Sequence, residues 1–163
     1  EAARAIKQRH PHVEFCLLGF LDPQNPKAIS SEQMDAWMKE GVVNYLGESD
    51  RVDEVIATAD CVVLPSYYRE GTPRTLLESA SMGKPIITTD NVGCRDVVDD
   101  GVNGFLCQKK DAVDLEHKLE MMLMLTVEER KKMGEKGREK ILKEFDEKIV
   151  FDKYKEAIGE IVL

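Results

Sequence analysis

The chain has 163 residues, of which 42% are apolar, and its 31 acidic residues outnumber its 23 Lys and Arg residues to leave a net charge of −8. This length suits one globular domain with its own core, and the acidic balance argues against nucleic acid or anionic lipid as partners. No apolar run approaches the roughly 18 residues that a membrane-spanning helix needs.

Apolar periodicity predicts strands alternating with helices. Strands are expected at residues 13–19, 42–46, 61–64, 85–88 and 104–107, and helices at 2–9, 31–39, 52–58 and 74–82. The pattern then changes to three successive helices, at 111–125, 126–143 and 146–161, the second of which opens with a capping box at Thr126. This order predicts an α/β domain with a Rossmann-like, doubly wound parallel sheet and a helical C-terminal tail.

The four cysteines are widely spaced, and Cys16, Cys61, Cys94 and Cys107 form no C-x-x-C pair. We therefore expect reduced, buried thiols, which suit a cytoplasmic protein, rather than a zinc or redox site. The chain opens in a helical pattern, whereas doubly wound domains normally begin with a strand. We expect a fragment, cut from a longer protein just after its first strand.

The stretch from residue 64 to residue 96 carries the chemistry. Its strand ends at Pro65, so the loop that follows lies outside the carboxyl edge of the sheet, where ligands of such sheets bind. Gly71 lets the backbone approach a ligand closely, and Pro73 suits the start of a helix because its missing N–H costs nothing there. The free N–H groups of that helix start form an anion site suited to a phosphate, beside the cation of Arg74.

Two carboxylates, Glu70 and Glu78, stand eight positions apart around this helix start. Carboxylates accept hydrogen bonds from vicinal hydroxyls, so the pair suits a ligand made of a sugar, a phosphate and a ribose. The spacing fits equally well two surface glutamates that favour the helix dipole by about 0.3–1 kcal/mol. Spacing alone leaves both readings open.

The segment P-S-Y-Y-R-E-G-T-P-R-T-L-L-E, with its E-x7-E pair, resembles the C-terminal, nucleotide-sugar-binding domain of a family 4 retaining glycosyltransferase of the GT-B fold. Strands ending at Gly19 and Gly47, Ala59-Asp60 before C-V-V-L-P-S, and D-G-V-N-G-F-L at 100–106 fit the same family. The resemblance covers nearly the whole chain, residues 1–163, which it identifies as this donor domain without its first strand or the N-terminal acceptor domain.

The resemblance implies a role for each matching residue. The catalytic residue would be Glu70, which contacts hydroxyls of the donor sugar, and Glu78 would hold the ribose hydroxyls. The rest of the donor pocket would be formed by the backbone of Gly71, Thr72 and Pro73 and by the loop that begins at Gly47. For Arg74, contact with the ligand and a surface position on the helix both stay open.

The family resemblance also implies the reaction. A hexose or N-acetylhexosamine would pass from a nucleotide diphosphate sugar, with UDP expected, to a glycan or lipid-linked acceptor in bacterial surface-polysaccharide assembly. The sequence has no D-x-D motif, so we expect no metal and no cofactor besides the donor substrate. An Arg and a Lys that normally hold the diphosphate would precede residue 1, so we expect the fragment alone to be inactive.

The parent enzyme is expected in the cytoplasm, with a peripheral contact to the inner face of the membrane through its missing domain. Two alternatives stay open: a non-catalytic nucleotide-sugar-binding module, and another GT-B enzyme such as a nucleotide-sugar epimerase. The E-x7-E context and G-x-N-G-F-L favour the transferase. Two local predictions complete the picture: Arg95 and Asp96 face the cleft or pair with each other, and Phe151, Tyr154 and Ile158 of the last helix are partly exposed.

Overall fold

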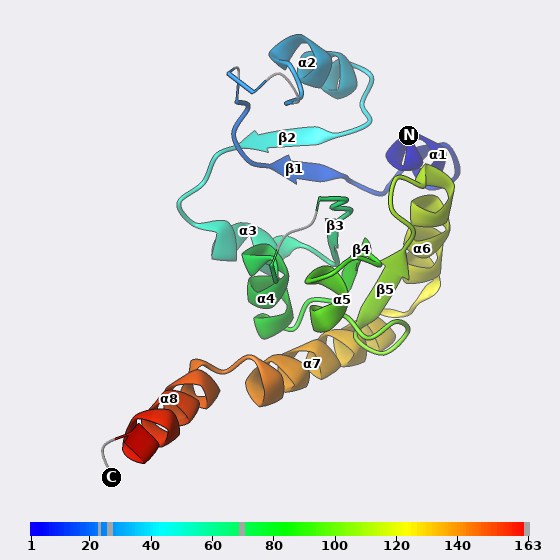
Figure 1. The fold of residues 1–163 in the computed structure, drawn as a ribbon. Coiled ribbons are helices and arrows are strands. Elements are labelled where there is room, and N and C mark those ends of the chain that lie inside the picture. The colour runs from blue at the N-terminus through cyan, green and yellow to red at the C-terminus, as the bar shows by residue number, and fades with distance from the viewer. Residues whose placement is uncertain (23, 26–27, 69–70, 162–163) are drawn as a thin grey trace.

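The structure is a computed structural model, and it describes residues 1–22, 24–25, 28–68 and 71–161. Its order of elements follows the expected alternation, with the helical tail after the last strand (Figure 1). The helices are α1 (Ala2–Arg9), α2 (Ser31–Lys39), α3 (Val52–Thr58), α4 (Arg74–Ser81), α5 (Cys94–Val97), α6 (Ala112–Met124), α7 (Val127–Glu144) and α8 (Glu147–Ile161). The strands are β1 (Cys16–Leu18), β2 (Asn44–Gly47), β3 (Val62–Leu64), β4 (Ile86–Thr89) and β5 (Gly104–Cys107).

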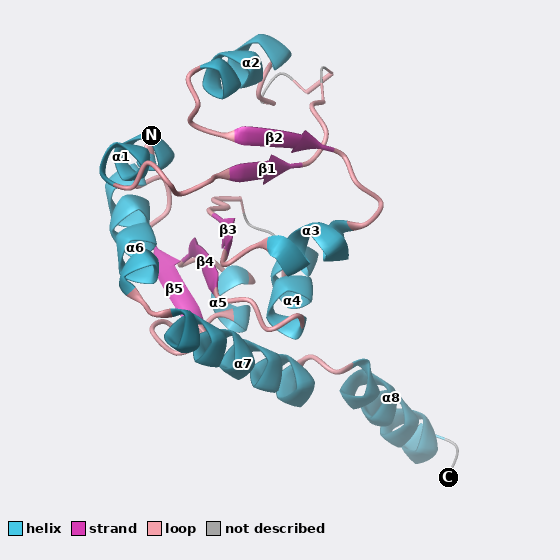
Figure 2. Cartoon of the chain, turned by 180° about the vertical axis from the view of Figure 1, so that it is seen from behind, coloured by secondary structure: helices cyan, strands magenta, loops and turns pink. Residues whose placement is uncertain are grey.

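The strands form two parallel sheets rather than one continuous sheet. In the described residues β1 pairs with β2, and β3, β4 and β5 pair in that order (Figure 2). Ile87 of β4 lies opposite Val63 and Phe105, so β4 is the central strand of its sheet and every residue in it is buried. Phe15, just before β1, packs against core clusters on both sheets and joins them through its side chain.

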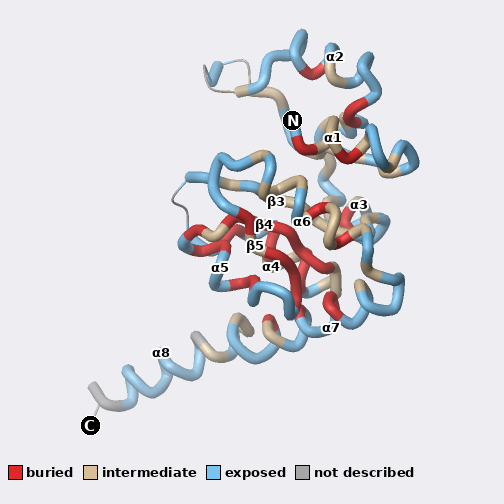
Figure 3. Tube along the Cα trace, turned by 90° about the vertical axis from the view of Figure 1, so that its right-hand side faces the viewer, coloured by how far each residue is buried: buried red, intermediate tan, exposed pale blue. Residues whose placement is uncertain are grey.

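Helices cover both faces of the three-stranded sheet, as the doubly wound prediction requires. Successive strand residues point to opposite faces. Ile87 therefore packs with Ile6 of α1 and Leu119 of α6, whereas Ile86 packs with Leu76 of α4 and Val97 of α5. The burial colours of Figure 3 show this core concentrated around β4 and β5, between the two helical layers.

Helix α7 lies close against the end of α4, and the contact depends on glycine. A Cβ atom built on Gly134 would stand 1.8 Å from the carbonyl oxygen of Gly83, and one built on Gly137 would stand 3.6 Å from the Cβ of Ala80. Gly83 itself has a φ of +69°, in the left-handed region that ends α4. Backbone contact between α4 and α7 thus fixes the position of the helix that follows the β3 loop.

Helix α8 extends beyond α7, away from both sheets, in all three views. The side chains of Phe151, Tyr154 and Ile158 are about 60% exposed, which confirms their expected exposure. Within the ranges that the structure describes, no helix is both long and apolar enough to cross a membrane.

The expected elements are found with small differences in their ends. The first strand is shorter than expected, because only Cys16–Leu18 pair with β2. Val13 and Phe15, which precede it, pack against the hydrophobic core. The short helix α5 was not among the expected elements. Cys94 and Cys107 are buried as expected, but Cys16 is exposed.

Candidate functional site

The loop after β3 delivers the start of α4 to the carboxyl edge of the three-stranded sheet. Pro73 stands immediately before the helix with φ −65° and ψ 125°, and its carbonyl oxygen accepts the amides of Leu76 and Leu77. No side chain of the described residues caps α4, so the amides of its first residues, Arg74 and Thr75, are the donors of the helix start. Gly71 and Thr72 are exposed and Pro73 is buried, which leaves the loop backbone open to a ligand.

Two of the predicted site residues contact each other directly. The Nε of Arg74 donates to Oε1 of Glu78 at 2.7 Å, across one turn of α4. The side chain of Arg74 is 90% exposed, while that of Glu78 is 38% exposed. The carboxylate of Glu78 therefore lies half-buried on the helix, and the exposed guanidinium of Arg74 lies beside it.

Two further predicted positions are Glu70 and Gly47. Glu70 lies outside the described residues, so its catalytic role stays a prediction from the sequence. Gly47 ends β2 of the other sheet with φ +72°, where its carbonyl accepts the amide of Gly19 at 2.9 Å. No hydrogen bond between described residues links Gly47 to the loop after β3.

An aromatic pair occupies the first part of the loop. The rings of Tyr67 and Tyr68 stack with centroids 4.3 Å apart, and the Tyr67 hydroxyl donates to that of Tyr68 at 2.9 Å. The Nζ of Lys110, from the loop after β5, lies 4.6 Å from the centroid of the Tyr67 ring, at cation–π distance. Loops that follow two different strands thus meet over the same edge.

Buried polar side chains at the end of β4 were not predicted to belong to the site. Thr88, Thr89 and Asn91 are at most 1% exposed, and each donates to a main-chain carbonyl of the β3 segment. Lys109, after β5, donates to Oδ1 of Asn91 at 3.1 Å. The sequence signal for these residues is the polar run T-T-D-N directly after two isoleucines. A local pattern does not identify the hydrogen-bond partners of such side chains.

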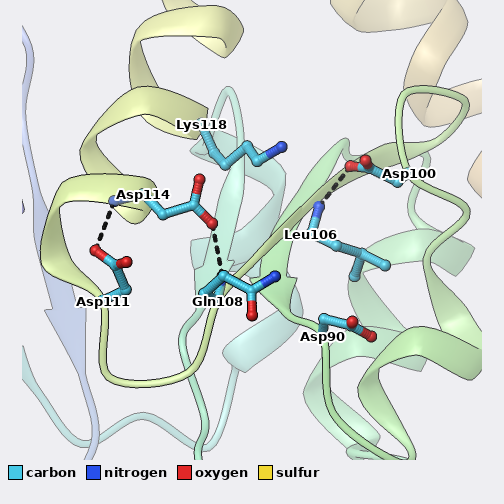
Figure 4. A pocket seen from close by; sticks show the side chains of 7 residues that line it. All are labelled: Asp90, Asp100, Leu106, Gln108, Asp111, Asp114 and Lys118. Carbon is cyan, nitrogen blue, oxygen red and sulfur yellow. Dashed lines mark hydrogen bonds between the residues drawn. The ribbon is translucent and has the colours of Figure 1, made fainter.

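A concave region beside the edge strand β5 is strongly acidic (Figure 4). Two of its carboxylates accept main-chain amides: Asp100 from Leu106 at 2.8 Å, and Asp114 from Gln108 at 2.7 Å. These amides lie on the outer edge of the sheet, and the carboxylates cover that edge. An acidic pocket repels phosphate, so it does not compete with the start of α4 as an anion site. Its lining consists of Asp90, Asp100, Leu106, Gln108, Asp111, Asp114 and Lys118.

In the G-C-R-D segment, the alternative of an ion pair between Arg95 and Asp96 is wrong. Arg95 pairs with Asp90 at 3.0 Å rather than with its neighbour Asp96. Burial raises the pKa of Cys107 to about 11, so this thiol stays protonated at neutral pH.

Among the residues that the structure describes, no three His, Cys, Asp or Glu side chains are grouped so as to hold a metal ion.

The chain matches the family of glycosyl transferases group 1 over residues 1–140. It is 33% identical over 123 residues to an N,N'-diacetylbacillosaminyl-diphospho-undecaprenol alpha-1,3-N-acetylgalactosaminyltransferase of Campylobacter jejuni. That match covers 76% of this chain and 30% of the relative. A putative glycosyltransferase EpsD of Bacillus subtilis is 30% identical over 143 residues, covering 88% of this chain and 36% of the relative. The chain thus spans about a third of the length of these curated relatives.

Solved structures show the same fold at low sequence identity. A glycosyltransferase from Rickettsia africae aligns with a TM-score of 0.83 at 18% identity, over 99% of this chain and 43% of that one. Anabaena Alr3699/HepE, solved in complex with UDP, aligns with a TM-score of 0.74 at 17% identity, over 98% of this chain and 52% of that one. These likenesses confirm the expected fold, the Rossmann-like half of a GT-B glycosyltransferase. With its α/β core and the family match over most of its length, the chain belongs to the glycosyl transferases group 1.

Proposed function

We propose that this chain is the donor-binding half of a retaining glycosyltransferase. In this proposal a hexose or N-acetylhexosamine passes from a nucleotide diphosphate sugar, UDP-linked, to a glycan or lipid-linked acceptor. The observation that carries the proposal is the start of α4 at the carboxyl edge of the sheet, which no side chain of the described residues caps, with the carboxylate of Glu78 one turn inside the helix. Glu70 completes the E-x7-E pair by sequence.

The diphosphate is assigned to the start of α4. The amides of Arg74 and Thr75 point out of the helix end, and the exposed backbone of Gly71 and Thr72 continues the donor surface. Such amides and the helix dipole favour an anion. In the proposed complex Arg74 adds a side-chain cation, and the diphosphate is held without a metal ion.

The ribose is assigned to Glu78 and the sugar to Glu70. A half-exposed carboxylate is desolvated at low cost and accepts two hydroxyl hydrogens, which matches the 2′ and 3′ hydroxyls of a ribose. Glu70 stands eight positions earlier in the sequence and is proposed to contact the donor sugar. The loop that begins at Gly47 is proposed to border the nucleobase.

The nucleotide and sugar classes rest on relatives. Anabaena Alr3699/HepE was solved with UDP and with UDP-glucose, and the Campylobacter jejuni relative is named for N-acetylgalactosamine transfer to a diphospho-undecaprenol acceptor. The first supports a UDP-linked hexose donor, and the second supports an N-acetylhexosamine. An acceptor on a lipid carrier would place the parent enzyme at the cytoplasmic face of a membrane.

Further segments of the parent protein are proposed to complete the enzyme. In the described residues β1 pairs only with β2 and β3 pairs only with β4. One parallel strand between β1 and β3 would join the two sheets into the single sheet expected from the sequence. We propose that this strand and an N-terminal acceptor domain come from the segment upstream, together with the remaining cations for the diphosphate.

A nucleotide titration tests donor binding. The chain, labelled with nitrogen-15, is titrated with UDP, GDP and ADP while amide shifts are followed by NMR. The expected result is UDP-selective binding with shifts concentrated at residues 71–78 and around Gly47. Should the chain and the full-length protein both leave every shift unchanged at millimolar UDP, the donor assignment is wrong. Binding by the full-length protein alone would show that upstream cations supply most of the affinity.

The stereochemistry of transfer needs the full-length protein. The anomeric proton of the product is followed by NMR from the first turnovers with a UDP-sugar of known α configuration. A retaining enzyme gives the α product, whereas a β product would overturn the retaining assignment. Repeating the assay after EDTA treatment tests the metal-independence: an unchanged rate is expected.

A further inference from the structure

Three polar side chains stand where the core is otherwise apolar. Thr88 and Thr89 end β4, directly after Ile86 and Ile87, and Asn91 follows two residues later. Their exposed fractions are 0%, 1% and 1%. Burying a hydroxyl or an amide costs free energy unless it is hydrogen-bonded. Each of these side chains must therefore find a partner inside the protein, and all three find it on the same segment.

The partners are alternate carbonyls of the chain that leaves β3. Thr88 Oγ1 donates to the carbonyl of Leu64 at 2.7 Å, Thr89 Oγ1 donates to that of Ser66, and Asn91 Nδ2 donates to that of Tyr68. The backbone pairing of β3 with β4 ends at Leu64 and Thr88. The side chains thus continue the attachment of β3 to β4 for four residues beyond the last paired strand residue.

Asn91 also ties this attachment to the third strand of the sheet. Its Oδ1 accepts the amide of Val92 at 3.0 Å and the Nζ of Lys109 at 3.1 Å. The neighbouring Lys110 lies over the ring of Tyr67. The segment 64–68 is consequently held from the end of β4 by hydrogen bonds and from the end of β5 by a cation over an aromatic ring.

Shape alone does not explain this arrangement. Valine has almost the same shape as threonine and would fill the same space, but it would remove the donor to the Leu64 or the Ser66 carbonyl. What the hydroxyls and the amide add is direction: each fixes the position of one carbonyl. The fixed segment leads, within a few residues, to Gly71 and the start of α4.

We propose that Thr88, Thr89 and Asn91 are positioning residues, a side-chain ladder that holds the loop after β3 in the geometry that binds the donor. The inference rests on the proposed function, in which this loop binds the diphosphate and the sugar. A loop that is already ordered pays less conformational entropy when its ligand binds, so the ladder increases donor affinity without touching the donor.

Two buried asparagines supply a matched pair of variants. Asn91→Asp removes the donor to Tyr68 but keeps the acceptor for Lys109 and Val92. Asn103→Asp makes the same change at a side chain of equal exposure, which donates to the Val97 carbonyl at 2.9 Å in a turn away from the loop. Asn91→Asp is expected to weaken UDP binding about five- to tenfold, as loss of roughly one hydrogen bond in the bound geometry implies. Asn103→Asp is expected to leave UDP affinity unchanged, although it unfolds more easily than the parent.

The threonines give a rescue test. Thr88→Val and Thr89→Val remove one hydroxyl each while keeping the branched shape, and Thr88→Ser and Thr89→Ser keep the hydroxyl. Hydrogen exchange of the amides at 66–68 and 71–72 is measured on each folded variant without ligand, together with UDP affinity. The valine variants are expected to exchange these amides about tenfold faster, and the serine variants to return them toward the parent rate.

The outcomes separate the ladder from the donor assignment. The positioning role is wrong if the valine variants and Asn91→Asp exchange the loop amides at the parent's rates and bind UDP with the parent's affinity. If the parent and the full-length protein bind no nucleotide, the proposed function fails, and the exchange rates still decide whether the ladder orders the loop. Equal losses of UDP affinity in Asn91→Asp and Asn103→Asp would show a general loss of stability and would also overturn the positioning role.

Discussion

The carboxylate of Glu78 accepts a hydrogen bond from Arg74 across one turn of α4, with 2.7 Å between Oε1 and Nε. This order of charges is the less favourable one on a helix, and a cation in the first turn opposes the dipole. Exposed ion pairs of this kind contribute about 0.2–1 kcal/mol to the free energy of unfolding. The pair therefore does little for the helix, and a ligand that offers hydroxyls to Glu78 and a phosphate to Arg74 can replace it.

Replacing Glu78 by Ala should weaken UDP binding by about 1.5–3 kcal/mol, the contribution of a hydrogen bond to a charged acceptor. The loss should be seen equally with uridine and should be much smaller with 2′-deoxy-UDP, because that ligand lacks one of the hydroxyls. Calorimetric titration of the full-length protein measures all three. Glu139→Ala, which removes an exposed carboxylate paired with Lys136 on α7, is the control. Equal affinity of Glu78→Ala and parent for UDP would make the ribose assignment wrong.

Replacing Arg74 by Met should affect the phosphates rather than the ribose. The expected loss for UDP is about two- to fivefold, as for an exposed charge pair, and it should shrink further at high salt. Uridine, which has no phosphate, should bind as before. A comparable loss with uridine would instead place Arg74 on the nucleoside, or show that it serves only to orient Glu78.

Replacing Gly134 by Ala should destabilise the fold, although Ala favours a helix over Gly by about 1 kcal/mol. The new Cβ would stand 1.8 Å from the Gly83 carbonyl oxygen, so α7 must move away from α4. Overpacking of this kind costs about 1–3 kcal/mol. Urea unfolding measures the change. Gly159→Ala on α8, where nothing lies within 4 Å of the new atom, is the matched control and should be neutral or stabilising.

The N-terminus of α7 should become less stable in acid. Hydrogen bonds from the amide and the hydroxyl of Thr126 lower the pKa of Glu129 below its usual value of 4.5. A carboxyl whose pKa is lowered by folding stabilises the protein above its unfolded pKa, and that contribution disappears as pH falls through the lower, folded pKa. Urea midpoints measured from pH 6 to pH 3 should fall less steeply for Glu129→Gln than for the parent. Parallel curves would show that the capping carboxylate does not take part in the acid response.

Local chemistry explains why most elements could be predicted. Caps are contacts between near neighbours: Thr126 with Glu129 in α7, and Asp111 with the first amides of α6. Buried strands are short apolar runs, and the residues of β4 are all buried as its sequence suggests. The pairing of Arg74 with Glu78 is likewise a contact one helical turn apart. Each depends on residues within about one turn of each other, which a pattern in the sequence contains.

The pairing of the strands and the ladder at the end of β4 could not be predicted in the same way. Thr88, Thr89 and Asn91 find carbonyls that lie 23 or 24 residues earlier in the chain. Such partners depend on which strands become adjacent and in what register. The sequence by itself determined the elements, their order and the E-x7-E segment, because these follow from local propensity and spacing. Only the tertiary structure decided which polar groups meet at the end of the sheet, because a buried donor takes whichever carbonyl strand pairing brings within reach.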